Sequence, residues 1–349
     1  MVTDPVSIIA GLSSRPFDAV LLIAFGGPQG PADVRPFLAN VLRGRRVAPE
    51  RVEEVAHHYE LFGGVSPLTR LTEAQAEGLR QRLRERGPAL PVYVGMRNWH
   101  PFLADTLAEM SRAGIRRAVG LIAAAHRSYS SCLQYKENVR DARAALREQG
   151  LADVDVTYVG DWYDHPMFIE ASAAEVEKAI AKLLDTDRSR ATLIFTAHSI
   201  PSSMAARYPY QEQYETTARL IAARLRASTD LPLPAATVYQ SRSGRPEDPW
   251  LGPDVCDFIR DQKAAGLLEA AVVVPAGFLS DHIEVLYDLD TEAAGLAAEL
   301  DVPMVRARAV NDHPAFLEML ADVVRATVER YATGRPLPLL GSDTGLTRV

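Results

Sequence analysis

Short, continuously apolar runs alternate along this chain with longer amphipathic stretches. The runs cover Ala19–Ala24, Val92–Gly95, Ala118–Ala123, Val154–Val159, Thr192–Thr196, Ala236–Tyr239 and Ala271–Pro275. Continuous apolar runs, as opposed to strict alternation, are typical of parallel strands that helices cover on both faces. The pattern therefore predicts an α/β fold with two doubly wound parallel sheets.

The chain length predicts two domains, because 349 residues exceed what one hydrophobic core usually organises. A weak internal correspondence agrees: VLLIAFGGP resembles TLIFTAHSIP, and GLIAAAHRS resembles VVVPAGFLSDH. We expect a first domain over 17–160, to which a helix over 314–331 returns. We expect the second domain over 161–313, with tails over 1–16 and 334–349.

Polar residues follow several of the predicted strands, at the point where each strand ends. Examples are the glycines after Phe25, the His126 segment, His198 and the loop before Glu284. Ligands of open α/β sheets bind at the carboxyl ends of the strands. The four loops are therefore predicted to face one cleft between the two domains.

Charge and composition exclude several classes of protein. A net charge of −7 and a pI near 5.7 argue against a nucleic-acid partner. Apolar runs such as Ala270–Leu279 are far shorter than the ~20 residues of a transmembrane helix, so we expect no membrane span and a cytoplasmic protein. Cys132 and Cys256 are too few for an iron-sulfur cluster. The glycine-rich nucleotide motifs and the serine-hydrolase motif are absent from the sequence.

His198 and three carboxylates are the candidates for chemistry. His198 follows a predicted strand, where an imidazole can accept protons near neutral pH or serve only as a structural hydrogen-bonding group. Glu284, Asp288 and Glu292 recur at a spacing of four, which predicts one acidic helix face. Such a face is either a solvated surface or a row of oxygen ligands for a divalent cation.

Six segments of this chain resemble motifs of the ferrochelatases, in the order that the family has them. These are FGGP, FGGVSPL, YVGMRNWHPF, TAHSIP, QSRSG…DPWLGPD and GFLSDHIEVLYDLD, between Phe25 and Asp290. The resemblance implies two Rossmann-like domains with a porphyrin held between them. It assigns catalysis and iron contact to His198 and Glu284, and it assigns Asp288 and Glu292 to guiding or holding metal.

The resemblance also suggests contacts with the ring. Ser66 and Tyr135 match positions that contact propionates in the coproporphyrin-using branch. Phe25 stands where some relatives carry a tyrosine that binds haem iron, and it is expected to pack on the porphyrin face or in the core beneath it. His126 is expected either to assist there or to be structural. Three arginines either pair with substrate carboxylates or form a solvated loop: Arg43, Arg45 and Arg46.

The expected function is insertion of Fe²⁺ into a porphyrin, with release of two protons, in haem biosynthesis. Coproporphyrin III is the favoured ring; protoporphyrin IX and a non-catalytic porphyrin or haem carrier are the alternatives, and a chelatase for another metal or tetrapyrrole is a further one. We expect Fe²⁺ to be a substrate and no cofactor to be bound permanently. A monomer is expected, and the protein that delivers iron or accepts haem is left open.

Overall fold

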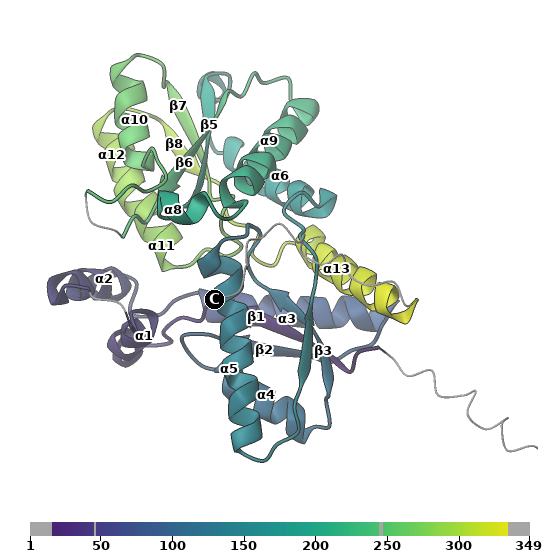
Figure 1. The fold of residues 1–349 in the computed structure, drawn as a ribbon. Coiled ribbons are helices and arrows are strands. Elements are labelled where there is room, and N and C mark those ends of the chain that lie inside the picture. The colour runs from purple at the N-terminus through teal and green to yellow at the C-terminus, as the bar shows by residue number, and fades with distance from the viewer. Residues whose placement is uncertain (1–15, 45–46, 244–246, 334–349) are drawn as a thin grey trace, which may run out of the picture.

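The computed structural model describes residues 16–44, 47–243 and 247–333. Two parallel four-stranded sheets organise these residues, one in each half of the chain (Figure 1). The strand order is β2-β1-β3-β4 in the first sheet and β6-β5-β7-β8 in the second. Because these orders are equivalent, the two halves repeat one topology, and the predicted α/β fold with two parallel sheets is confirmed.

The elements of the first half alternate as the apolar pattern predicted. They are β1 (Ala19–Ala24), η2 (Pro31–Asp33), α1 (Val34–Val41), α2 (Pro49–Leu61), α3 (Leu68–Arg86), β2 (Val92–Met96), α4 (Leu103–Arg112), β3 (Arg117–Ile122), η3 (Tyr129–Leu133), α5 (Gln134–Glu148) and β4 (Asp155–Tyr158). One face of the sheet packs on α4 and α5, and the other packs on α3. Strands β1, β2 and β3 are thus largely buried on both faces, which explains their continuous apolar sequences, whereas β4 at the edge of the sheet is partly exposed.

The second half follows the same plan and ends in a long helix. Its elements are α6 (Pro166–Ile180), α7 (Asp185–Arg188), β5 (Ala191–His198), α8 (Ser202–Ala205), α9 (Tyr210–Ser228), β6 (Ala235–Gln240), α10 (Val255–Ala264), β7 (Ala270–Val274), α11 (Ile283–Val285), η4 (Leu286–Ala293), α12 (Ala294–Glu299), β8 (Met304–Arg306) and α13 (Pro314–Ala332). Strand β8 was not predicted, because three residues are too short to show a period.

One hydrophobic core joins the two halves. It includes Val20 and Leu22 of the first sheet together with Leu193 and Phe195 of the second. Helix α13 packs on α3 and also on α6, so it lies between the halves (Figure 1). The division proposed near residue 160 falls in the link between β4 and α6. Shared burial of this kind favours a fixed arrangement of the two sheets.

Helices α1 and α2 form a small unit to one side of the first sheet (Figure 1). Phe37 and Ala56 are its buried centre, and Phe25 and Trp99 pack against it. Across the molecule, the ring of His58 stacks on Tyr287 of η4, with centroids 3.6 Å apart. The unit therefore contacts the second half as well as the first.

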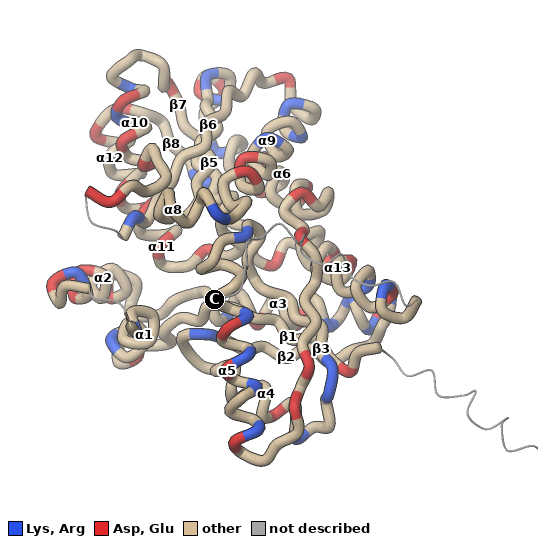
Figure 2. The backbone as a smooth tube through the Cα atoms, in the orientation of Figure 1, with Lys and Arg blue, Asp and Glu red and all other residues tan. Residues whose placement is uncertain are grey.

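Basic and acidic residues are interspersed along both halves (Figure 2). This differs from the concentrated basic surface that binds nucleic-acid phosphates. In the part of the chain that the structure describes, none of the helices combines the length and apolarity that crossing a bilayer requires.

Candidate active site

His198 is the last residue of β5, and Glu284 follows the loop after β7. Strands β5 and β7 are neighbours in the sheet, so the polypeptide that leaves each strand emerges at the same edge. The His198 Nε2 atom lies 3.9 Å from Glu284 Oε1. Both side chains are partly exposed, at 35% and 47%, so a substrate can reach both of them.

The tautomer of His198 follows from its other ring nitrogen. Nδ1 lies 2.5 Å from the carbonyl oxygen of Ser199. Because a carbonyl only accepts hydrogen bonds, Nδ1 carries the hydrogen. In the neutral ring this leaves the lone pair on Nε2, the atom that faces Glu284, so Nε2 is available as a base or as a metal ligand.

A second imidazole flanks Glu284 on its other side. His282 Nδ1 lies 3.9 Å from Glu284 Oε2. Burial lowers the pKa of His282, although the negative charge of Glu284 opposes this shift. His282 is therefore neutral at pH 7, and it lies beside the glutamate without forming a strong ion pair.

The acidic segment that follows Glu284 is not the regular α-helix that the spacing suggested. Glu284 lies in α11, whereas Asp288 and Glu292 lie in η4, which is a π-helix. π-helical turns are rare and are frequent at functional sites. The wider turn is a tertiary outcome that the i, i+4 pattern did not reveal.

Asp288 is held close to His198 by the neighbouring strand. Gln240 pairs with His198 in the register of β5 and β6, and its Nε2 donates to Asp288 Oδ2 at 3.0 Å. The hydroxyl of Ser241 donates to the same oxygen. Burial raises the pKa of Asp288 to about 7, and the hydrogen bond from Ser241 counteracts part of this shift. Asp288 therefore titrates in the neutral range.

Glu292 lies further along the same segment. Burial raises its pKa, and the charge of Asp254 raises it further. Within residues 16–44, 47–243 and 247–333, no group of three or more His, Cys, Asp or Glu side chains is arranged as a metal site. The four predicted metal ligands thus form a close pair, His198 and Glu284, with Asp288 and Glu292 beyond it.

Side chains of the first half border the pair. Phe25 contacts Phe37 edge to face at 6.2 Å, and Phe37 contacts Tyr59 at 5.6 Å. Burial raises the pKa of the Tyr59 phenol, and the charge of Glu284 raises it further, which places Tyr59 near that carboxylate. A row of aromatic side chains, made of Phe25, Phe37 and Tyr59, therefore leads from the end of β1 towards Glu284. No local pattern in the sequence marked Tyr59.

Arg97 lies between two of the predicted porphyrin contacts. Its guanidinium carbon is 5.9 Å from the ring centre of Phe25 and 5.7 Å from that of Tyr135. Tyr135 is only 6% exposed, and burial raises its pKa, so the phenol stays neutral. No local pattern in the sequence marked Arg97 as a contact, although the residue lies within the motif YVGMRNWHPF.

The other predicted contacts differ in accessibility. Ser66 is buried at 3%, and its Oγ accepts from the backbone N–H of Leu68 at 3.4 Å. Arg43 is exposed and donates to Asn40 Oδ1 at 2.5 Å. Arg45 and Arg46 lie outside the described residues.

His126 requires a correction, because the structure does not place it on an open surface. It is 2% exposed, and its Nε2 lies 2.9 Å from the Thr217 hydroxyl on α9. Burial lowers its pKa to about 3. Of the two roles considered for His126, the structure favours the structural one, at the junction of the two halves. Its position after an apolar strand could not distinguish a strand-end ligand from a buried junction residue.

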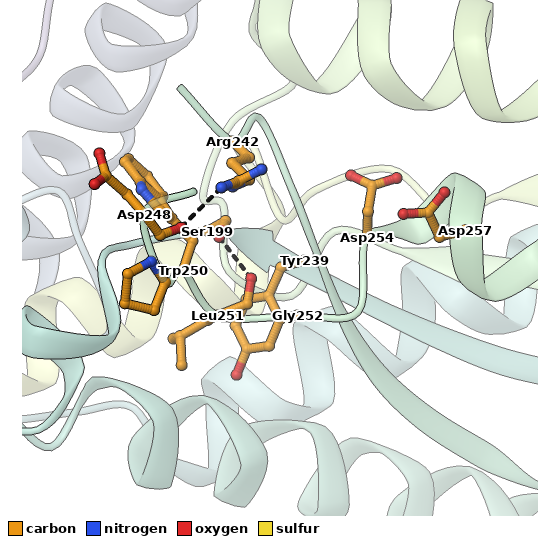
Figure 3. Close-up of a pocket in the computed structure, with 10 residues that line it drawn as sticks. Ser199, Tyr239, Arg242, Asp248, Trp250, Leu251, Gly252, Asp254 and Asp257 are labelled. Atoms are coloured by element: carbon orange, nitrogen blue, oxygen red, sulfur yellow. Dashed lines mark hydrogen bonds between the residues drawn. The ribbon is translucent and has the colours of Figure 1, made fainter. Parts of the chain in front are cut away.

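A small pocket is lined by Ser199, the residue after His198, and by residues of the loop that contains Trp250 and Leu251 (Figure 3). Its volume is about 340 Å³, at the lower end for small-molecule sites. Ser199 donates to the carbonyl of Leu251 at 2.7 Å, and Arg242 donates to that of Asp248 at 2.8 Å (Figure 3). The first bond joins Leu251 to the strand end that carries His198, and the second links Arg242 to Asp248 within the motif QSRSG…DPWLGPD.

The fold is a two-domain arrangement of the chelatase type. The structure resembles that of the chelatase SirB from Bacillus subtilis with Fe³⁺, with a TM-score of 0.55 over 90% of this chain and 97% of that chain. A cobalt complex of the sirohydrochlorin chelatase SirB gives 0.51 over 89% and 95%. Both are 11% identical in sequence, so they show the fold alone.

The ferrochelatase family model matches residues 17–328, and the chain belongs to this family. The coproporphyrin III ferrochelatase of Streptomyces coelicolor is 45% identical over 97% of this chain and 94% of its own. That of Streptomyces griseus is 46% identical over 92% and 87%. The ferrochelatase of Rhodopirellula baltica is 44% identical over 93% and 90%. The family resemblance seen in the sequence motifs is thereby confirmed.

Proposed function

We propose that this protein inserts Fe²⁺ into coproporphyrin III and releases two protons, as a step of haem biosynthesis. The observation that carries the proposal is the pairing of His198 with Glu284 at 3.9 Å in a chain of the ferrochelatase family. The choice of ring is supported by the relatives named coproporphyrin III ferrochelatase, among them those of two Streptomyces species.

The geometry of the pair suits both halves of the reaction. Metallation must remove two pyrrole N–H protons and replace water around the metal. Nε2 of His198 has a free lone pair, so it can accept a proton from a pyrrole nitrogen. The Glu284 carboxylate and an imidazole are suitable transient ligands for a divalent first-row metal. In this proposal Fe²⁺ is a substrate that passes through the site, and no cofactor is permanently bound.

Asp288 and Glu292 supply the approach for iron in this proposal. Both lie on η4 beyond Glu284, and partial removal from water raises the pKa of each carboxyl. Because the pKa of Asp288 is about 7, this carboxyl is partly neutral near pH 7. A partly neutral carboxyl binds a dication less tightly than a charged one, so Asp288 can pass the metal on to His198 and Glu284.

The porphyrin would lie against the first half, over the aromatic row. Phe25 is partly exposed and offers an apolar face, and Arg97 lies between it and the buried Tyr135 with a charge suited to a ring carboxylate. Ser66, Arg43, Arg45 and Arg46 stay predicted contacts for propionates. In the same proposal, the protein acts as a monomer in the cytoplasm.

Anaerobic metallation tests the proposal. Purified protein receives Fe²⁺ with coproporphyrin III or protoporphyrin IX, and insertion is followed by absorbance. Faster turnover of coproporphyrin III supports the proposal. A preference for protoporphyrin IX would change only the identity of the substrate ring and would keep the assignment as an iron-inserting enzyme. Binding of both rings without turnover would instead identify a porphyrin carrier. His57→Ala is a matched control for variants of His198, because the His57 side chain is 66% exposed on α2.

A further inference from the structure

The segment between Asp281 and Asp290 carries His282, Glu284 and Asp288. It includes a loop, the short helix α11 and part of the π-helix η4. π-helical hydrogen bonding is rare and is seldom stable without tertiary support. The position of the metal-binding carboxylates therefore depends on what holds the two ends of this segment.

One side chain contacts both ends. Arg306, the last residue of β8, donates from Nη1 to Asp281 Oδ1 at 2.7 Å. The same guanidinium donates from Nε and Nη2 to the two carboxylate oxygens of Asp290, at 2.6 Å and 2.8 Å. The planar guanidinium makes this two-pronged pairing directional, which an ammonium group cannot reproduce.

Several further hydrogen bonds hold the Asp281 end of the segment. Its carboxylate also accepts from the Ala309 backbone N–H at 3.1 Å and from Asn311 Nδ2 at 2.8 Å. Asn311 in turn accepts from the Asp281 backbone N–H at 2.9 Å. Arg306 and Asp281 are only 11% and 13% exposed. Charge-assisted bonds at such a buried position are strong and fix the backbone that they join.

The first half of the molecule contacts the same loop. Gln75 of α3 is 1% exposed, and its Nε2 lies 2.8 Å from the carbonyl of Asn311 and 3.3 Å from Ser280 Oγ. The loop is therefore anchored to the aromatic half as well as to β8. At the Asp290 end, Leu289 packs in the core of the second half, and the two-pronged bond from Arg306 holds the side of the turn that carries Asp290.

From this geometry we infer that Arg306 is a positioning residue for iron. By holding Asp281 and Asp290 at once, it fixes the segment that carries Glu284 and Asp288, while Gln240 and Ser241 hold the Asp288 carboxylate directly. Arg306 does not touch the substrate itself. This inference rests on the proposed function. It implies that weakening the bond affects the metal and leaves the porphyrin contacts on the first half unchanged.

Asp290→Asn is the test variant, because Asp290 is 41% exposed. In this variant the buried Arg306 still pairs with Asp281, so no buried charge is left without a partner. Asp153→Asn is the matched control. Asp153 is 38% exposed and accepts an equivalent pair of bonds from Arg143, at 2.9 Å and 2.8 Å, in the first half. Asp290→Glu retains the carboxylate and is the conservative variant.

We expect Asp290→Asn to raise the KM for Fe²⁺ about tenfold, the usual effect of losing a group that orients metal ligands. The KM for coproporphyrin III should not change, Asp153→Asn should behave as the wild type, and Asp290→Glu should recover most of the iron affinity. Arg306→Lys should resemble Asp290→Asn. Equal iron KM values for Asp290→Asn and Asp153→Asn, or a parallel rise in the porphyrin KM, would overturn the inference.

Titration with Co²⁺ by calorimetry provides a readout without turnover. Weaker Co²⁺ binding by Asp290→Asn than by Asp153→Asn supports the role of Arg306 even if the wild type inserts no iron, in which case only the proposed function fails. Equal Co²⁺ affinities of the two variants would refute the positioning role whether or not the wild type is active.

Discussion

Gly277 is where the packing of the two catalytic segments can be tested most directly. It follows β7, and its backbone N–H donates to the carbonyl of Thr196 at 2.9 Å. A Cβ added at this position would lie 2.5 Å from Ala197 Cβ and 2.6 Å from Ala197 Cα. Ala197 is fully buried and directly precedes His198. Both close atoms belong to Ala197, which has no flexible side chain that could move aside.

The Gly277→Ala variant must therefore separate two backbone segments. To reach an ordinary contact of 3.4 Å from 2.5 Å, the end of β5 and the loop that leads to Glu284 must move apart by about 0.9 Å. Overpacking of this kind costs about 1–3 kcal/mol of unfolding free energy. A misplacement of about 1 Å at reacting groups costs on the order of 10²-fold in rate, so we expect kcat for metallation to fall by about that factor.

Steady-state anaerobic iron insertion, paired with urea unfolding, measures both effects. Gly295→Ala is the control, because a Cβ at Gly295 in α12 meets nothing within 4 Å. That variant should keep wild-type kcat and gain up to about 1 kcal/mol from helix propensity. A folded Gly277→Ala protein with wild-type kcat would refute the reasoning, since it would show that the separation of the two segments does not limit the reaction.

Three further predictions concern single groups. His126 is neutral in the folded protein, with a pKa of about 3 against 6.5 when unfolded, so its contribution to stability is present above pH 6.5 and is lost as the pH falls. The loss should reach about 3 kcal/mol near pH 4.5, measured by urea unfolding, and His126→Gln should remove this component; an identical acid profile in that variant would contradict it. Because the pKa of Asp288 is about 7, it gains charge as the pH rises from about 6 to 8, and the KM for Fe²⁺ should fall over that range in the wild type but not in Asp288→Asn. His198→Ala and Glu284→Gln should each slow metallation by at least about 10²-fold while coproporphyrin binding, followed by fluorescence, persists; wild-type turnover in both would exclude the assigned roles.

The local sequence determined the secondary structure and the strand-end positions of the active residues. Seven apolar runs became β1 to β7, because burial of both faces imposes a continuous apolar pattern on each strand. His198 is the last residue of its strand, as its position after an apolar run predicted. Glu284 lies in the helix that follows the β7 loop. Parallel strands bring their carboxyl ends to one edge, so the pairing of these two residues was also foreseeable.

Other features depend on contacts between residues far apart in the chain, which no local period records. Strand β8 is defined by its pairing with β7, and the π-helical turn lies in a segment that Arg306 anchors at both ends. His126 and Ser66 follow the same kinds of local pattern as accessible residues, yet α9 covers the first and Gly27 packs against the second. Tyr59 and Arg97 reach the site only because α2 and the β2 loop fold against the end of β1. Sequence period reports which face of an element is buried, whereas the neighbour that buries it is decided by tertiary packing.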